Sequence, residues 1–406
     1  MSLNIKIKKS ALAGRIAAPP SKSMAHRMLI CAGLANGRSV IHGISDSEDM
    51  SATLSCLRAL GVSCEKKGDT VTVDGIDIKK ASANAPLNCN ESASTLRFFI
   101  PLCLMSGADF ELVGSKSLFT RPLSVYEKIC KEQSFKFERN SESGIRVSGE
   151  LYGREYKVDG NISSQFISGL LFALPLCEGD STVSIAPPIE SRSYLDLTIQ
   201  ALELFGIKIE WSDERTLYIK GGQRYSPREA KVEGDYSNAA FFSAMNLFDG
   251  NNVEIDGLLD TSLQGDRAYI KFFDMLCRGT PTIHIGNCPD LGPVLMAVAA
   301  AKNGAVLCGT HRLKIKESDR GAAMAEELAK FGVSVAVHDD SIVVYPTDFH
   351  APSTVLSGHN DHRVVMSLSV LLTLTGGEIE GAEAVNKSLP TFFDMMTSLG
   401  CEVEKA

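Results

Sequence analysis

The sequence predicts an α/β protein with two bodies of three repeats each, in which apolar helices lie inside a shell of strands and amphipathic helices. Three observations support this fold class. The chain has 406 residues, 44% of them hydrophobic, which suffices for a large core and exceeds the usual length of one domain. Nearly apolar helical segments recur at a regular spacing. Amphipathic segments that end at a glycine recur in step with them.

The apolar segments each follow a polar turn, and they begin at residues 21, 90, 163, 236, 289 and 360. Their spacing is about seventy residues, which is longer than a solenoid repeat and suits a compact supersecondary unit. The unit between residues 236 and 289 is shorter than the others. Because a helix that is apolar on all sides must be covered on all sides, we place these helices in the interior.

The amphipathic segments end in Leu or Phe and a glycine, and two alternating strands follow. This pattern occupies residues 57–75, 202–222 and 328–346, and its first half closes the chain. The glycines suit the left-handed backbone position that ends a helix; they are Gly61, Gly206, Gly332 and Gly400. Each unit therefore combines a buried helix, an amphipathic helix and several strands.

Parallel buried helices would bring their N-termini together at one end of each body. The unpaired N–H groups and the helix dipoles would then attract anions to that end. The net charge of the chain is −8, which argues against a broad nucleic-acid surface and favours a focused anion site. The pattern predicts a cleft that binds small anions.

Polar groups suited to anion binding and proton transfer occupy five of the six helix starts. They are Lys22, Ser23 and Arg27 at the first, Glu91 and Arg97 at the second, Ser163, Ser164 and Gln165 at the third, Asp290 at the fifth, and His362 and Arg363 at the sixth. Taken singly, each fits a helix cap or a solvated charge; Asp290 alone looks like a cap. Independent capping explains the whole set poorly, because the groups recur at equivalent places.

A basic stretch precedes the amphipathic helix of the fifth unit. Its alternation predicts a strand with Arg312, Lys314 and Lys316 on one face, followed by a turn that carries Glu317 and Arg320. A solvated run of charges is the alternative interpretation.

Other features limit the class of protein. The 11 cysteines form no C-x-x-C pair, which is typical of reduced, cytosolic proteins. We find no long apolar span, no signal-peptide core, no metal-ligand motif and no phosphate-binding glycine loop. We therefore expect a cytoplasmic monomer that acts on small molecules without metal or cofactor and without a nucleic-acid or membrane partner.

Taken together, the motifs resemble those of the EPSP synthase (3-phosphoshikimate 1-carboxyvinyltransferase) family, in the family's order and over essentially the whole chain. The matching stretches are "PPSKSMAHR", "CNESASTLRFF", "FTRPL", "GNISSQFISGLL", "VEGDYSNAAFF", "CPDLGPVLMAVAA", "LKIKESDR", "NDHRVVM" and "NKSLPTFF". The resemblance implies a two-domain inside-out α/β barrel of six βαβαββ-type repeats, three per domain, with the active site in the interdomain cleft. It assigns residues 1–18 and 236–406 to one domain and 19–235 to an inserted domain.

The resemblance also implies the reaction: transfer of the enolpyruvyl group of phosphoenolpyruvate to the 5-hydroxyl of 3-phosphoshikimate, with release of phosphate. The positions that match the family's phosphoenolpyruvate site are Lys22, Glu91, Arg121, Gln165, Arg320, Arg363 and Lys387. Those that match its 3-phosphoshikimate site are Ser23, Arg27, Ser163, Ser164, Gln165, Ser191, Tyr194, Asp290 and Lys316. Each substrate brings a carboxylate and a phosphate, and fixed cations make their mutual approach tolerable.

The implied catalytic residues are Lys22, Asp290 and Glu317. Asp290 would accept the proton of the 5-hydroxyl, and Glu317 would protonate the methylene carbon of phosphoenolpyruvate, with Lys22 as the alternative proton donor. Lys22 would also stabilise charge between the hydroxyl and the departing phosphate. The pKa of Glu317 would have to rise for the acid role, whereas neighbouring cations would lower it.

Two departures from the family pattern affect these expectations. Ala93 stands at a usual glycine position, and in the family that alanine accompanies poor binding of the inhibitor glyphosate, so we expect weak glyphosate inhibition. Arg312 stands where an asparagine is common, so the resemblance assigns no shikimate contact to Arg312.

Two other functions are possible from the sequence. UDP-N-acetylglucosamine enolpyruvyl transferases share the fold, but they typically carry a cysteine near an Arg-Pro pair, and Arg121-Pro122 is preceded by "GSKSLFT". A non-catalytic anion-binding relative would not need both Asp290 and Glu317.

Overall fold

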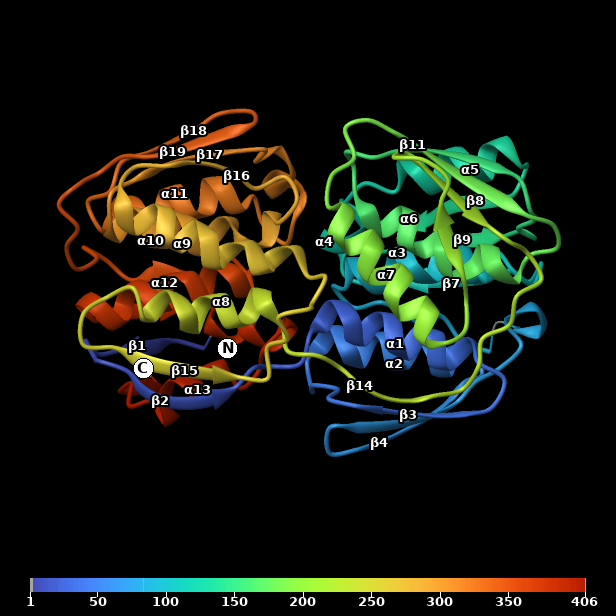
Figure 1. Cartoon of the computed structure of the whole chain (residues 1–406), viewed down its shortest axis with the longest axis horizontal. Helices are drawn as coiled ribbons and strands as arrows, with labels where there is room; N and C mark the ends of the chain where they lie inside the picture. Colours follow the sequence, from blue (N-terminus) through green and yellow to red (C-terminus); the bar gives the residue numbers. More distant parts are fainter. Residues whose placement is uncertain (1–2, 83, 406) are drawn as a thin grey trace. The chain divides into compact units, whose positions relative to one another are not determined.

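The computed structural model describes residues 3–82 and 84–405. The chain divides into two compact units. One unit spans Pro20–Glu233, and the other combines the chain up to Pro19 with the chain from Gly234 onward. Each unit has its own hydrophobic core, and in each the sheets lie outside the helices (Figure 1).

The unit Pro20–Glu233 contains three successive repeats. The first holds α1 (Lys22–Leu34), β3 (Arg38–His42), α2 (Glu48–Ala59), β4 (Ser63–Lys67) and β5 (Thr70–Asp74). The second holds β6 (Leu87–Asn88), α3 (Ala93–Cys103), β7 (Phe110–Val113), α4 (Lys116–Phe119), α5 (Ser124–Glu132), β8 (Lys136–Ser141) and β9 (Gly144–Ser148). The third holds β10 (Glu155–Asp159), α6 (Ser164–Ala173), β11 (Ser181–Ala186), α7 (Arg192–Leu204), β12 (Ile209–Trp211) and β13 (Thr216–Ile219), after which β14 (Glu229–Lys231) returns to the first repeat.

The sheets of this unit share one strand order, because each repeat contributes one parallel pair and one antiparallel hairpin. The orders are β14-β3-β5-β4, β6-β7-β9-β8 and β10-β11-β13-β12. The first two strands of each sheet are parallel and the remaining neighbours are antiparallel. β14 supplies the strand that the first repeat lacks at its own start.

The other unit follows the same plan with one shortened repeat. Its elements are β1 (Ile5–Ile7), β2 (Ala13–Ala17), α8 (Tyr236–Met245), β15 (Asn252–Asp256), α9 (Tyr269–Arg278), β16 (Thr282–His284), α10 (Gly292–Ala301), β17 (Ala305–Cys308), α11 (Arg320–Lys330), β18 (Val335–Val337), β19 (Ser341–Val344), β20 (Leu356–Ser357), α12 (His362–Thr375), β21 (Gly377–Glu380), α13 (Phe392–Ser398) and β22 (Val403–Lys405). Its sheets are β15-β2, β16-β17-β19-β18 and β20-β21-β1-β22. The short repeat that the sequence predicts is therefore the one that keeps the parallel pair and lacks the hairpin.

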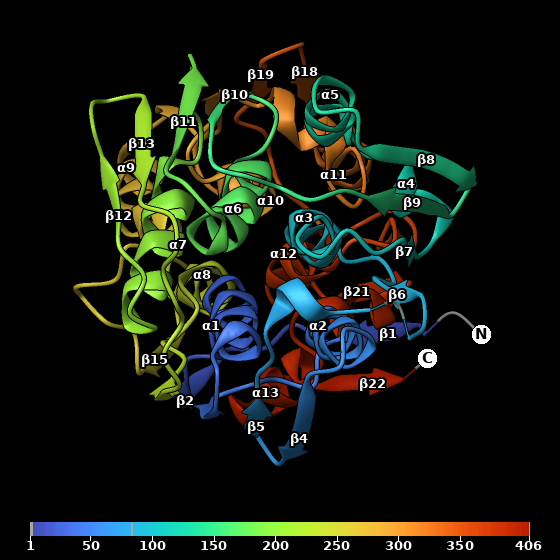
Figure 2. The same cartoon turned by 90° about the vertical axis from the view of Figure 1, so that its right-hand side faces the viewer.

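The recurring apolar segments form the interior helices, as predicted (Figure 2). Every residue of α10 from Gly292 to Ala300 is buried, and so is every residue of α12 from His362 to Thr373. By contrast, α9 buries Tyr269, Phe273 and Leu276, half-buries Phe272 and Met275, and exposes its other residues. The fold is thus an α/β architecture with helices enclosed by sheets.

The glycines predicted to end amphipathic helices have left-handed backbones, with φ of 98° at Gly61, 83° at Gly206, 83° at Gly332 and 96° at Gly400. The predicted strand at residues 312–316 is wrong. This segment is a 3₁₀ helix, His311–Ile315, because Gly309, with φ of 72°, turns the chain away from the sheet after β17. Both edges of β17 are already paired, with β16 and β19.

Candidate active site

Asp290 lies at the centre of a cation cluster in the unit that contains α8 to α13. Its Oδ1 accepts hydrogen bonds from Lys316 Nζ at 3.1 Å and from Arg320 Nη1 at 2.9 Å, and its Oδ2 accepts one from Arg363 Nη2 at 3.1 Å. The interpretation of Asp290 as a helix cap is wrong, since it lies in a 3₁₀ turn, Pro289–Leu291, and α10 has no side-chain cap. The three cations hold the carboxylate instead.

Arg320 connects this carboxylate to two others. It is the first residue of α11, and its side chain is 1% exposed. Its Nε donates to Asp361 Oδ2 at 2.8 Å, and its Nη2 donates to Glu317 Oε2 at 2.6 Å. Asp361 is fully buried and caps α12 by accepting a hydrogen bond from the backbone N–H of Arg363. A buried arginine with three carboxylate partners fixes the geometry of the helix starts around it.

The N-termini of the buried helices of this unit meet at the cluster, as predicted. Arg363, at the start of α12, donates to Ser237 Oγ at the start of α8 at 3.0 Å and to Asp290 just before α10. Lys387 follows β21 in the sequence, and its Nζ donates to the carbonyl oxygen of Asn360 at 2.7 Å. Positive side chains and helix N-termini therefore coincide, which is the arrangement that favours an anionic ligand.

The electrostatics of the cluster follow from burial and from these contacts. Burial alone would raise the pKa of the Asp290 carboxyl, but the charges of Arg363, Lys316 and Arg320 outweigh it and hold that pKa well below its usual range. Burial lowers the pKa of Lys316, and the charges of Arg312 and Arg320 lower it further, although Asp290 opposes the shift. Asp290 is thus ionised, and it balances cations that an anionic substrate could take over.

In the unit Pro20–Glu233, α1 carries the predicted residues of the first helix start. Ser21 is the N-cap, so Lys22 and Ser23 lie inside the first turn. Lys22 Nζ donates at 2.8 Å to Oδ2 of Asp49, which belongs to α2. The side chains of Lys22 and Asp49 are 16% and 15% exposed, so this ion pair is only partly in contact with solvent.

Arg27 is buried, and the alternative of a solvated arginine is wrong. Its Nε donates to Thr198 Oγ1 at 2.8 Å, its Nη2 to the carbonyl oxygen of Tyr194 at 3.1 Å, and its Nη1 to the carbonyl oxygen of Ser23 at 2.6 Å. Burial lowers the pKa of Arg27 to about 10. Arg27 therefore links the first turn of α1 to α7, and Ser191 immediately precedes α7 with a left-handed φ of 56°.

The starts of α3 and α6 are joined through Gln165. Its Oε1 accepts from Arg97 Nη1 at 2.8 Å, and its Nε2 donates to Ser94 Oγ at 2.8 Å. Ser163 caps α6, and Ser164 is the first residue of that helix. Gln165 is thus held between two helix starts.

The remaining predicted residues lie near the same helix starts in the chain. Glu91 directly precedes the N-cap Ser92 of α3, and Ala93 is the buried first residue of that helix. Arg121 is 9% exposed and follows α4. The predicted set divides between the units: Lys22, Ser23, Arg27, Glu91, Arg121, Ser163, Ser164, Gln165, Ser191 and Tyr194 belong to Pro20–Glu233, and Asp290, Lys316, Glu317, Arg320, Arg363 and Lys387 belong to the other.

Sequence reasoning missed the carboxylates that hold the predicted cations. Asp49 pairs with Lys22 from 27 residues away, and Asp361 pairs with Arg320 from 41 residues away. Only Asp361 carried a signal in the sequence, because it directly precedes the apolar segment that forms α12 and is therefore a cap candidate. Asp49 could be found only from the packing of α2 beside α1.

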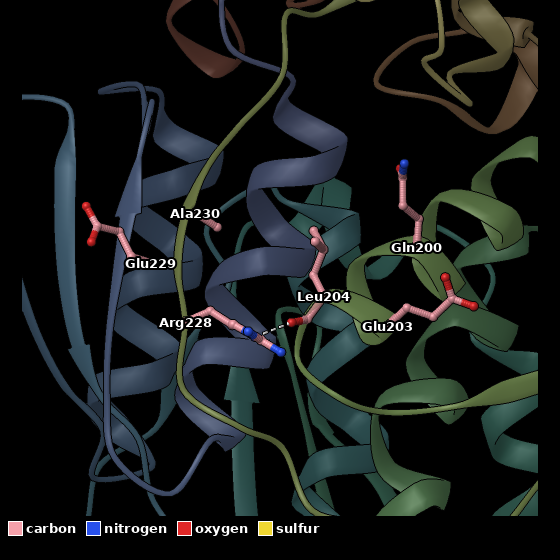
Figure 3. Close-up of a pocket in the computed structure, with 6 residues that line it drawn as sticks. All are labelled: Gln200, Glu203, Leu204, Arg228, Glu229 and Ala230. Atoms are coloured by element: carbon pink, nitrogen blue, oxygen red, sulfur yellow. Dashed lines mark hydrogen bonds between the residues drawn. The ribbon is translucent and has the colours of Figure 1, made fainter.

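Two surface hollows are lined by none of the predicted site residues. One, of about 440 Å³, lies between the end of α7 and β14, where Arg228 donates to the carbonyl oxygen of Leu204 (Figure 3). The other, of about 550 Å³, is lined by α8, β15 and α9 in the shortened repeat.

In the described part of the chain, none of the helices is both long and apolar enough to cross a membrane.

Comparisons with known proteins agree with the fold and the motifs. The family model described as EPSP synthase (3-phosphoshikimate 1-carboxyvinyltransferase) matches residues 7–396. Proteins named 3-phosphoshikimate 1-carboxyvinyltransferase from Clostridium perfringens and Clostridium kluyveri are 39% and 38% identical to this chain; the first match covers 97% of each chain, and the second covers 99% of this chain and 98% of the relative.

Two solved structures share the fold. EPSP synthase from Acinetobacter baumannii matches with a TM-score of 0.79 and 23% identity over 99% of this chain and 100% of its own. The enolpyruvyl transferase NikO from Streptomyces tendae matches with a TM-score of 0.79 and 14% identity over 100% of this chain and 99% of its own. Since the family model and the relatives cover nearly the whole sequence, the chain belongs to the EPSP synthase (3-phosphoshikimate 1-carboxyvinyltransferase) family.

Proposed function

We propose that this chain transfers the enolpyruvyl group of phosphoenolpyruvate to the 5-hydroxyl of 3-phosphoshikimate, giving 5-O-(1-carboxyvinyl)-3-phosphoshikimate and phosphate. This is the reaction of its family, and it lies on the shikimate pathway to chorismate and the aromatic amino acids. The observation that carries the proposal is the convergence of Lys316, Arg320 and Arg363 on the single carboxylate of Asp290. Such a cluster can exchange its internal anion for a substrate anion.

The residues that we assign to phosphoenolpyruvate from the resemblance come from both units. Arg320, Arg363 and Lys387 supply fixed positive charge beside the N-terminus of α12, where the dipole also favours an anion. Residues of the other unit complete the set, namely Lys22, Glu91, Arg121 and Gln165. Arginine suits this role because its planar fork matches carboxylate and phosphate oxygens.

The 3-phosphoshikimate site also draws on both units. Arg27 is held rigidly by α1 and α7, which favours recognition of the substrate carboxylate. Hydroxyl and amide groups at the starts of α6 and α7 supply neutral donors for the phosphate and ring hydroxyls; they are Ser163, Ser164, Gln165, Ser191 and Tyr194, together with Ser23 on α1. Lys316 and Asp290 complete the set.

Asp290 is the general base. In the free enzyme its three cationic partners stabilise the carboxylate and make it a weak base. When substrate anions draw Arg320 and Arg363 onto themselves, the proton affinity of Asp290 rises, and it can accept the proton of the 5-hydroxyl. The base is therefore activated by the arrival of the second substrate.

Glu317 is the favoured acid, with Lys22 as the alternative. A proton moves from the acid to the methylene carbon of phosphoenolpyruvate, the alkoxide forms a C–O bond to the adjacent carbon, and a tetrahedral intermediate results. Elimination breaks the C–O bond to phosphate, which leaves with the bonding pair and takes up the proton held by Asp290, while a methyl proton returns to the acid. The contact of Arg320 with Glu317 stabilises the carboxylate form, so the acid role requires substrate to divert Arg320.

The test is release of phosphate from phosphoenolpyruvate in the presence of 3-phosphoshikimate or, separately, UDP-N-acetylglucosamine. We expect release with 3-phosphoshikimate alone. Release only with the sugar nucleotide would identify the sister activity, and saturable binding of 3-phosphoshikimate without release would identify a non-catalytic relative.

We also propose that the two compact units are the two domains of the enzyme, and that it works as a monomer in the cytoplasm without metal or cofactor and without a nucleic-acid or membrane partner. We expect the protein to sediment as a monomer at assay concentration and to keep full activity after exhaustive chelation.

A further inference from the structure

The turn between β20 and α12 has an unusual backbone. His359 and Asn360 are consecutive non-glycine residues with left-handed φ angles of 47° and 52°, a conformation that costs free energy and persists only where neighbours enforce it. The turn also supports the site directly. The carbonyl oxygen of Asn360 accepts from Lys387 Nζ, and the next residue, Asp361, holds Arg320 and caps α12.

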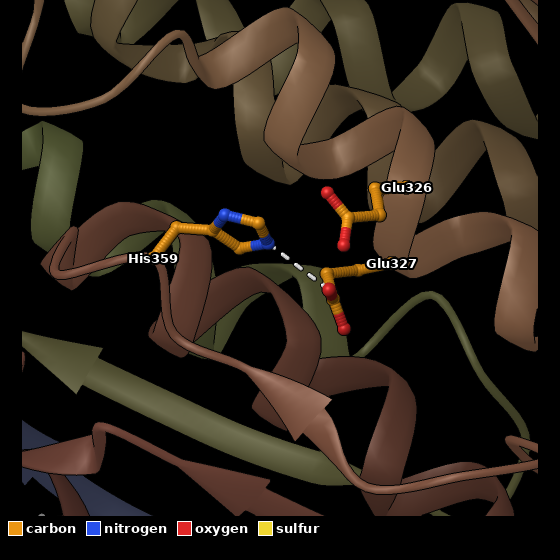
Figure 4. Close-up of side chains that lie close together, drawn as sticks. All are labelled: Glu326, Glu327 and His359. Atoms are coloured by element: carbon orange, nitrogen blue, oxygen red, sulfur yellow. Dashed lines mark hydrogen bonds and ion pairs between the residues drawn. The ribbon is translucent and has the colours of Figure 1, made fainter.

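Glu327 of α11 contacts this turn through its carboxylate. Its side chain is fully buried, and its Oε1 accepts from His359 Nε2 at 3.0 Å while its Oε2 accepts from the backbone N–H of Ser357 at 2.9 Å. Figure 4 shows the imidazole of His359 pointing at this carboxylate. Lys330 Nζ donates to both carboxylate oxygens, at 3.0 and 2.9 Å, and to the carbonyl oxygen of Val355 at 3.1 Å.

One helix therefore contacts the turn at two places. Arg320 contacts Asp361 at the start of α11, and Glu327 contacts His359 two helical turns later, about 10 Å along the helix axis. Between these contacts lies Asn360, whose carbonyl oxygen accepts the hydrogen bond from Lys387 Nζ. A change at Glu327 would reach Lys387 and Arg363 through this segment.

The same side chains raise the possibility of a metal site. Glu326, Glu327 and His359 each offer a ligand atom, and these atoms lie within 4.8 Å of one another. However, the Lys330 ammonium already donates to both oxygens of Glu327, and Glu326 is exposed. The contacts favour a neutralised, hydrogen-bonded carboxylate over a metal ligand.

We infer that Glu327 is a positioning residue for phosphoenolpyruvate binding: by fixing the His359–Asn360 turn it sets the positions of Lys387, Arg363 and Asp361. The inference rests on the proposed function. It concerns phosphoenolpyruvate in particular, because Arg363 and Lys387 belong to the phosphoenolpyruvate set, whereas most residues proposed for 3-phosphoshikimate lie in the unit Pro20–Glu233, to which neither Glu327 nor the turn belongs.

The experiment compares Glu327→Gln with Glu326→Gln, a neighbour that changes the same charge on the exposed side of the same helix. We expect Glu327→Gln to raise KM for phosphoenolpyruvate about tenfold, with KM for 3-phosphoshikimate changed less than about twofold. Glu326→Gln should match the wild type in both. Equal rises in the two KM values, or no rise, would overturn the inference.

A second pair of variants keeps the test decisive if Glu327→Gln fails to fold. His359→Asn tolerates the left-handed backbone but is too short to replace the Nε2 contact, whereas His359→Gln can place an amide N–H there. We expect the first to raise KM for phosphoenolpyruvate and the second to restore it in part. The same KM for both variants would contradict a role for the contact.

The wild-type assay separates this inference from the proposed function. A wild-type enzyme that releases no phosphate refutes the proposed function, whereas an active wild type with an unaffected Glu327→Gln refutes only the positioning role. Loss of phosphoenolpyruvate affinity after chelation, shared by Glu326→Gln, would show a metal site instead.

Discussion

Asp290 shows how a single side chain can have its chemistry set by its neighbours. Three cations hold its carboxylate in the ionised form, and we propose that they also hold it where the substrate anions bind. Taken singly, an aspartate before an apolar segment is the usual signal for a helix cap, whereas the recurrence of polar groups at equivalent helix starts predicted an anion site. The structure shows no side-chain cap at α10 and three cations around Asp290.

Replacement of Asp290 by Asn should separate catalysis from binding. The variant keeps the shape and removes the base, so we expect kcat to fall by about 100-fold or more. Phosphoenolpyruvate should bind at least as tightly, because Lys316 and Arg363 lose the anion that competes with it. Steady-state kinetics and calorimetric titration measure the two effects; a kcat within about tenfold of the wild type would exclude the base role.

His26 should make the unit Pro20–Glu233 sensitive to acid. Burial lowers its pKa to about 3, Lys22 and Arg27 add to the shift, and Asp49 opposes it. Above the ordinary pKa of 6.5, His26 is neutral in both states and has no effect. As the pH falls from 6.5 toward 3, only the unfolded chain takes up the proton, so stability is lost, by about 2 kcal/mol at pH 5.

The measurement is urea unfolding at pH 7.5 and pH 5, followed by the fluorescence of Trp211, the single tryptophan, which lies in the same unit. The control variant is His26→Asn. Thr95 Oγ1 donates to Ser92, so Thr53 must donate to Thr95, and His26 Nδ1–H must donate to Thr53. Asparagine keeps a donor at that place without titrating, so its stability should change less between the two pH values.

Among the elements, the helix starts carry the residues of the proposed site, and their order was visible in the sequence. The period of about seventy residues placed the interior helices, and their polar starts predicted a common anion site. The period gave no information about which carboxylates neutralise the cations, because Asp49 and Asp361 contact them across helices. Nor could alternation at 312–316 reveal the 3₁₀ helix, because the cations there have separate partners: Lys316 pairs with Asp290, whereas exposed Lys314 pairs with Asp339.

Asp361 links helix capping to the cation cluster, and two variants distinguish these contributions. Asp361→Ala removes the cap of α12 and leaves buried Arg320 with less compensation, so we expect a loss of about 3–5 kcal/mol in the free energy of unfolding. Asp361→Asn keeps an acceptor for the N-terminus and should lose less stability. Urea unfolding followed by far-ultraviolet circular dichroism tests this order, and equal losses would assign the whole effect to charge.

For the whole molecule, the fold class could be predicted because every repeat shares one hydrophobic pattern. The pairing partner of each strand could not be predicted from that pattern. β1 inserts between β21 and β22, and β2 is the sole partner of β15 in its sheet among the described residues. These pairings join segments separated by more than two hundred residues, and the pattern of a short strand does not identify its partner.

The two units should differ when expressed as fragments. Residues 20–233 include every strand of their own sheets and should fold alone with native-like secondary structure. Residues 234–406 lack β1 and β2, so their outer sheets are incomplete, and we expect this fragment to be unfolded or aggregated until a peptide of residues 1–19 is added. Circular dichroism and resistance to proteolysis measure both; an independently folded 234–406 fragment would contradict the expectation.

The antiparallel pairing of β1 with β22 sets Ile5 opposite Lys405, so these two terminal strands of the chain are neighbours. If a short peptide joined them and the chain were cut between Pro19 and Pro20, each unit of three repeats would be continuous in the sequence. The native order of the chain is therefore a circular permutation of two tandem sets of three repeats, and one unit is inserted in the other only because of where the chain is opened.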